Sequence, residues 1–141
     1  MHTLEIKLKF GTSFFDLKEI MSAMGPVEMD YWRIVDLECV SLPTGVWAAQ
    51  ELEELVDSSP NGFIVTREQL ATIAASIFQT IWCIVVGHQN SAPSIIVEAQ
   101  DSTRWVVGST SIGVVSNLQK QFSDTKIVAE HELEFIKYKL V

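Results

Sequence analysis

The stretch that decides the fold is residues 80–108, which reads TIWCIVVGHQNSAPSIIVEAQDSTRWVVG. It holds three apolar, β-branched runs, at 81–87, 94–99 and 104–107, and turn residues separate them. Short runs of this composition between turn signals are typical of β-strands. The first run has too few polar residues to face water on either side, so we expect it at the centre of a sheet. We expect residues 94–108 to form a hairpin, because the connection between its two runs is short and turn-like.

Amphipathic segments on both sides of this stretch extend the sheet and cover it. Alternation over residues 3–10 predicts a half-buried strand, and residues 30–40 predict one strand, or two short strands joined by a turn near Asp36. Residues 126–129 predict a further strand, and residues 132–141 a terminal edge strand. Helical spacing predicts four helices: one capped at Ser13 and stopped by Gly25-Pro26, one over 46–57, one from Thr66 to about Gln79, and one from Ser109-Thr110-Ser111 to Phe122, with Ile112, Val115, Leu118 and Phe122 on the sheet.

Together these elements predict the fold class. We expect an α+β (mixed α/β) protein with a mostly antiparallel sheet of about five to seven strands and four helices packed on it. The 141 residues suit one compact domain over 1–141, because a chain of this length can bury one core. The sequence contains no internal repeat and no long linker that would divide it.

Charge and hydropathy exclude several classes of partner. The formal net charge of −8 argues against general affinity for nucleic acid or anionic membranes, which need clustered Lys and Arg. No apolar run approaches the ~20 residues that span a bilayer, and the first residues lack the pattern of a signal peptide. We therefore expect a cytoplasmic protein. Cys39 and Cys83 both fall in predicted strands, where we expect buried thiols rather than a disulfide.

The most informative charge pattern is the absence of Lys, Arg and His between Ile34 and Thr66. This segment contains six acids: Asp36, Glu38, Glu51, Glu53, Glu54 and Asp57. On a helix that starts by Val46, four of them share a face opposite the apolar stripe, with Trp47 beside Glu51 and Glu54. This face is either an ordinary solvated surface or an anionic surface that attracts a basic partner, with Trp47 as an aromatic anchor. The residues predicted to bind the partner are Trp47, Gln50, Glu51, Glu53, Glu54 and Asp57.

Motifs of enzymes, metal sites and cofactor sites are absent from the sequence. The chain contains no Gly-x-Ser-x-Gly elbow, no Walker loop and no dinucleotide fingerprint, and the segment 131–134 does not complete a zinc motif. We therefore expect no catalytic residue, no metal ligand and no cofactor. One alternative is a small enzyme or ligand-binding domain with a pocket near His88 and Asp101. Another is a homo-oligomeric structural module that pairs through the terminal strand, although a monomer or weak homodimer is the main expectation. Trp32, Trp82 and Trp105 are expected to pack in the core.

A resemblance rests on residues 30–34 (Asp30-Tyr31-Trp32-Arg33-Ile34), the apolar run 81–87, and Asp101-Ser102 followed by Trp105 and a helix ending in Phe122. This order, over residues 28–124, is similar to a family of small, uncharacterised bacterial proteins and, more loosely, to immunity proteins of bacterial toxin systems. The resemblance implies a compact mixed α/β fold, a bacterial context and a toxin as partner. With the acidic segment, it leads us to expect a non-catalytic immunity or antitoxin-type protein that neutralises a basic toxin, such as a nuclease.

Overall fold

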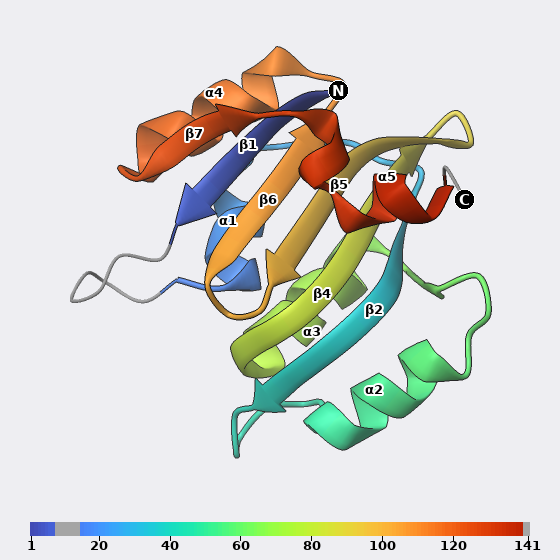
Figure 1. Cartoon of the computed structure of the whole chain (residues 1–141). Helices are drawn as coiled ribbons and strands as arrows, with labels where there is room; N and C mark the ends of the chain where they lie inside the picture. Colours follow the sequence, from blue (N-terminus) through green and yellow to red (C-terminus); the bar gives the residue numbers. More distant parts are fainter. Residues whose placement is uncertain (8–14, 140–141) are drawn as a thin grey trace.

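One seven-stranded sheet forms the frame of the molecule (Figure 1). The computed structural model describes residues 1–7 and 15–139. The strand order is β3-β2-β4-β5-β6-β1-β7, and every neighbouring pair is antiparallel. The strands are β1 (His2–Lys7), β2 (Tyr31–Ser41), β3 (Phe63–Val65), β4 (Ile77–Gln89), β5 (Ala92–Gln100), β6 (Arg104–Ser109) and β7 (Thr125–Val128). The predicted α+β class is confirmed.

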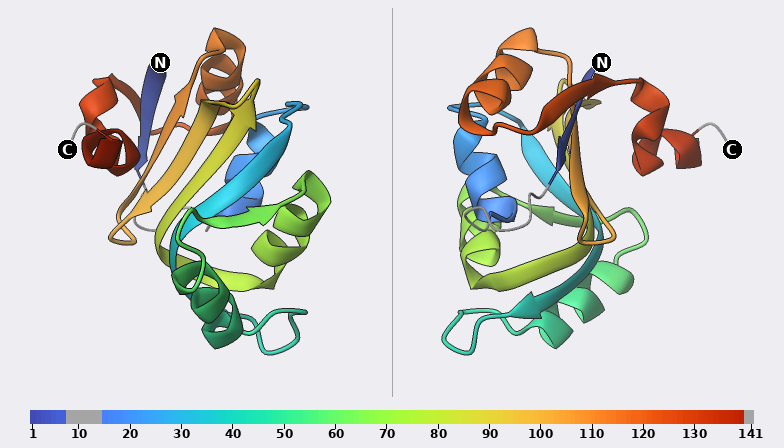
Figure 2. Two further views of the ribbon diagram at one scale, coloured as in Figure 1. Left: turned by 90° about the vertical axis from the view of Figure 1, so that its right-hand side faces the viewer. Right: turned by 60° about the vertical axis from the view of Figure 1, so that its left-hand side comes forward.

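The helices lie on both faces of this sheet. They are α1 (Leu17–Ala23), α2 (Ala49–Asp57), α3 (Arg67–Ser76), α4 (Ile112–Gln121), the short 3-10 helix η1 (Glu130–Glu132) and α5 (Glu134–Lys139). Figure 2 shows α1, α3 and α4 on one face and η1 with α5 on the other, while α2 lies alongside β2. The larger hydrophobic core lies under α1, α3 and α4, and a smaller cluster lies under η1 and α5. Among the described residues, no helix is long and apolar enough to cross a membrane.

The stretch 80–108 lies in the middle of the sheet, as predicted. β5 is the fourth of the seven strands, and its last seven residues are all buried. The hairpin is confirmed as β5 and β6, joined by a tight turn in which Asp101 has φ 54° and Ser102 has φ 56°. Two successive residues with positive φ match the twist of the strands that such a turn connects. Trp32 and Trp105 are buried in the core, whereas Trp82 is half-buried.

Two predictions on the elements were wrong in part, and one alternative left open is decided. β2 is one continuous strand, the first of the two predicted alternatives, and a register shift between Ile34 and Asp36 accounts for its imperfect alternation. α3 ends at Ser76, so Ile77 and the two residues after it belong to β4. On α4, Ile112 is 58% exposed and Val114 packs inward instead, because Ile112 is the first residue of the helix.

The termini of the described segments also differ from the prediction. The C-terminal tail is η1 and α5 rather than an edge strand, so the predicted pairing of copies through a terminal strand loses its basis. α1 begins after Asp16, whose side chain caps it in a capping box with Glu19. The predicted cap Ser13 and the end of the first predicted strand, residues 8–10, lie outside the described residues.

Both cysteines are free and buried, as predicted. Burial, with smaller contributions from the charges of Glu53 and Asp16, raises the pKa of Cys39 to about 11. Burial also raises the pKa of Cys83 far above its ordinary value. Because the thiolate is the reactive form, less than about 1% of either thiol is reactive at pH 8. We expect no reaction with a disulfide reagent such as DTNB in the native protein and two reacting thiols after unfolding in guanidinium. Rapid labelling of the native protein would contradict this assignment.

Candidate functional site

Trp47 does not lie on α2. The helix begins at Ala49, three residues later than the predicted start, and Trp47 precedes it in the connecting loop. Its side chain is half-buried and packs against the larger core, and its backbone N–H donates to Ser76 Oγ at 3.3 Å. The prediction that Trp47 projects beside Glu51 and Glu54 was wrong, because it assumed a helix that already existed at Val46.

Glu53 has a structural role at the edge of the sheet. β3 pairs with residues 32–34 of β2, and no strand of the described residues adjoins the next part of that β2 edge. There the backbone N–H of Cys39 donates to Glu53 Oε1 at 3.0 Å. An unpaired N–H on an open strand edge needs an acceptor. The half-buried Glu53 supplies it and fastens α2 along β2.

The remaining predicted residues form an exposed group on α2, which we call the acidic α2 face: Gln50, Glu51, Glu54 and Asp57. On the opposite side of the helix, Leu52 and Val56 are buried in the larger core. Gln50 Nε2 donates weakly to Glu54 Oε1 at 3.4 Å. None of the three acids is in an ion pair with a described residue. Their charges are therefore presented to solvent by a helix that the core holds in place.

His88 and Asp101, the two residues of the alternative pocket, do not lie together. His88 lies at the end of β4 next to the β4–β5 turn, whereas Asp101 lies in the turn at the other end of β5. His88 is buried, stacks on Tyr31 with ring centroids 4.7 Å apart, and accepts a hydrogen bond at Nε2 from Arg33 Nε at 2.8 Å. The register therefore places the two residues at opposite ends of β5, so they cannot line one site.

A buried polar network, which the sequence reasoning missed, lies under η1 and α5. Glu98 is 1% exposed, and its carboxylate accepts hydrogen bonds from the backbone N–H groups of Glu134 at 2.8 Å and Phe135 at 2.9 Å and from Gln100 Nε2 at 2.9 Å. Burial raises the pKa of Glu98, and these hydrogen bonds oppose that rise. The only sequence signal was a lone carboxylate within an apolar strand, which we now read as a structural anchor.

Arg104 completes this network from the neighbouring strand. Its guanidinium contacts Glu132 Oε2 at 3.0 Å and Glu5 Oε1 at 3.3 Å, and its Nε donates to Gln100 Oε1 at 2.9 Å. These contacts lower the pKa of Glu132 and raise that of Arg104, although burial opposes the rise at Arg104. With Leu133 and Phe135 buried on the sheet, the network holds the C-terminal segment in place. Neither of the two cavities described next reaches it.

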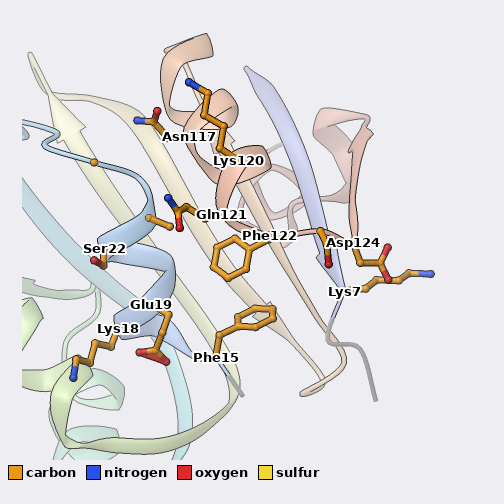
Figure 3. Close-up of a pocket in the computed structure, with 13 residues that line it drawn as sticks. Lys7, Phe15, Lys18, Glu19, Ser22, Asn117, Lys120, Gln121, Phe122 and Asp124 are labelled. Atoms are coloured by element: carbon orange, nitrogen blue, oxygen red, sulfur yellow. The ribbon is translucent and has the colours of Figure 1, made fainter. Parts of the chain in front are cut away.

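The larger cavity lies between α1 and α4 and has a volume of about 810 Å³ (Figure 3). We call it the α1–α4 cleft. Its centre is an aromatic pair, Phe15 and Phe122, with ring centroids 4.6 Å apart and an angle of 44° between the rings. Polar side chains of both helices and three lysines surround this pair: Ser22, Asn117, Gln121, Lys7, Lys18 and Lys120. Phe15 comes just before α1 and Phe122 just after α4, so only the folded chain brings them together.

A second cavity of about 650 Å³, which we call the Trp32 cavity, lies beside β3 and the start of α3. The guanidinium of Arg67 lies over the Trp32 ring at 5.9 Å from its centroid, and Arg67 Nη1 donates to the carbonyl of Val27 at 3.4 Å. Three acids also line it, at positions 28, 30 and 68. This cavity is therefore net negative.

No metal site was predicted, and no group of three or more potential metal ligands gathers within residues 1–7 and 15–139. His131 and Glu132, which belong to the incomplete zinc motif at 131–134, lie on η1. Since Glu132 pairs with Arg104, this segment contributes to holding the C-terminal region. Comparison with known proteins gives no further assignment, because no family model, no curated protein and no solved structure matches the chain.

Proposed function

We propose that this chain is a non-catalytic binding protein that engages a basic protein partner through the acidic α2 face. The partner that fits the sequence resemblance is a basic bacterial toxin domain, which the protein would neutralise by covering its active surface. The observation that carries the proposal is the arrangement of α2. Leu52 and Val56 fix the helix to the core, while Glu51, Glu54 and Asp57 are exposed and form no ion pair with a described residue.

A surface of this kind acts mainly on association. Like charges gathered on one helix face produce a field that attracts a basic partner before contact. Because Leu52, Val56 and the contact from Glu53 to Cys39 hold the helix in place, the charges keep their positions without loss of freedom on binding. Of the two apolar side chains just before α2, Val46 is 79% exposed, whereas Trp47 packs against the larger core.

The proposal is tested by reversing charge on the acidic α2 face. The double variant Glu51→Lys, Glu54→Lys is expected to bind a basic partner protein, sought first among the products of the neighbouring genes, roughly thirtyfold more weakly than the wild type does. Isothermal titration calorimetry with the purified partner measures this change.

The matched control reverses two exposed acids elsewhere, Glu28→Lys and Glu68→Lys, and so changes the net charge of the chain by the same amount. Its affinity should stay within about threefold of the wild type, because distant exposed charges are screened. Equal losses in the two variants would mean that only net charge matters. No loss in the α2 variant would reject the acidic α2 face as the binding surface.

A further inference from the structure

The α1–α4 cleft has the size and lining of a small-molecule site. Its volume of about 810 Å³ falls in the range of pockets that hold drug-sized ligands, about 300–1,000 Å³. Phe15 and Phe122 are only half-buried, so part of their ring surface is open to the cleft. Figure 3 shows the two rings facing one another between α1 and α4, with Glu19 and Gln121 beside them. A flat apolar group can stack on such rings.

Polar groups around the rings are available to a ligand. Ser22 and Gln121 are exposed, and their side chains make no hydrogen bond with another described residue. The Nδ2 group of Asn117 donates to the carbonyl of Met24 at 3.1 Å, and this hydrogen bond fixes the orientation of the Asn117 amide. Glu19 accepts a hydrogen bond from the backbone N–H of Asp16 at 2.9 Å, so one of its oxygens is already used in capping α1.

The residues that line the cleft carry a net positive charge, whereas the whole chain has a net charge of −8. Three lysines line it, Lys7, Lys18 and Lys120, against two carboxylates, Glu19 and Asp124. None of the three lysines is in an ion pair with a described residue. In Figure 3 their ammonium groups lie around the rim rather than at the centre. Since a lysine stem has four rotatable carbons, these groups can turn toward an anion that sits over the rings.

The Trp32 cavity is a natural comparison within the same molecule. It is similar in size, at about 650 Å³, and also contains an aromatic ring. Its charged lining is Glu28, Asp30 and Glu68 against Arg67, which already lies over the ring. The two cavities therefore differ in the sign of their charge and in the exposure of these rings, since Trp32 is 1% exposed whereas Phe15 and Phe122 are half-buried.

From these observations we propose that the α1–α4 cleft binds a small organic anion with a flat apolar body, such as an aromatic carboxylate. Phe15 and Phe122 contact the body of the ligand, Ser22 and Gln121 offer hydrogen bonds, and Lys18 and Lys120 neutralise its charge. The site shares no residue with the acidic α2 face, so it can be tested independently of the proposed function.

The experiment uses 2-naphthoate as probe and 2-naphthylmethylammonium as its cationic counterpart, with amide chemical shifts of the ¹⁵N-labelled full chain as the readout. We expect 2-naphthoate to shift Ser22, Gln121 and Phe122 in a saturable manner, and to bind there roughly fivefold more tightly than the ammonium probe. If these residues show no saturable shifts up to about 10 mM probe, the proposal is overturned, because a dissociation constant above that concentration is too weak for a functional site. Equal binding of both probes would also overturn it.

Two variants separate the cleft from general charge effects. The double variant Lys18→Gln, Lys120→Gln should weaken 2-naphthoate roughly fivefold and leave the ammonium probe unchanged or slightly tighter. The control Lys126→Gln, Lys137→Gln removes the same charge from exposed positions outside the cleft and should leave both affinities unchanged. Ser22→Trp places a large side chain in the cleft and should abolish the shifts. Unchanged binding in the cleft variants would reject this site.

Discussion

Replacing Asp16 with alanine is expected to lower the free energy of unfolding by about 4 kcal/mol. Asp16 is buried, and it caps α1 while it also bonds to β4 across 64 positions of sequence. Its Oδ2 accepts the backbone N–H of Thr80 at 2.8 Å, and its Oδ1 accepts the Thr80 hydroxyl. Loss of the cap costs about 1 kcal/mol, and each lost bond to a charged acceptor costs about 1.5 kcal/mol. Denaturation in guanidinium, followed by circular dichroism, measures the sum.

The variant Asp16→Asn is the control for this prediction. Asparagine is a good N-cap residue and keeps one acceptor oxygen, so this change should cost clearly less than the change to alanine. The two variants together separate the capping of α1 from the long-range contact with Thr80. A loss below about 1 kcal/mol for Asp16→Ala would mean that the cap alone matters.

Replacing Gly87 with valine is expected to lower the free energy of unfolding by about 3 kcal/mol. Gly87 lies opposite Trp32 on β4, and a Cβ there would come within 2.8 Å of Met29 Cγ and 3.0 Å of Trp32 Cζ3. Trp32 is 1% exposed and has no room to move, so the added side chain must displace it. Tryptophan fluorescence of the folded state should change together with the denaturation midpoint.

Gly113 provides the matched control for this substitution. It lies on the exposed side of α4, where a Cβ would meet only Ser111 Oγ, at 3.5 Å. Gly113→Val should therefore change the free energy of unfolding by no more than about 0.5 kcal/mol, since valine and glycine are both poor helix formers. If the two valine variants were equally stable, the tight packing of Trp32 against Gly87 would be refuted.

Features set by neighbouring residues could be predicted from the sequence. The apolar runs in 80–108 gave the middle of the sheet and the hairpin, because composition and turn residues act within a few positions. The helix predicted from Thr66 also starts there, since Thr66 is the N-cap of α3 and forms a capping box with Gln69. Thr66 Oγ1 accepts the backbone N–H of Gln69 at 3.1 Å, and Gln69 Oε1 accepts that of Thr66 at 2.9 Å.

Features set by distant residues could not be predicted. The tail became a helix rather than a strand because Glu98, 36 positions away, accepts the N–H groups that begin α5. Trp47 packs inward because the loop before α2 runs past Ser76. The α1–α4 cleft joins Phe15 to Phe122, and no periodicity in the sequence relates those two positions. Of the predicted site residues, Gln50, Glu51, Glu54 and Asp57 share an exposed helix face as predicted. Glu53 instead accepts a hydrogen bond from the edge of β2.

The most direct test of the proposed function is the rate of association with the basic partner protein at two ionic strengths. Screening shortens the reach of charge from about 30 Å at 0.01 M to about 10 Å at 0.1 M salt. Stopped-flow measurements should show that the wild-type rate falls at least about tenfold over this range. The Glu51→Lys, Glu54→Lys variant should associate slowly at both salt concentrations. A wild-type association rate that does not change with ionic strength, or a variant that associates as fast as the wild type, would contradict the role of the acidic α2 face.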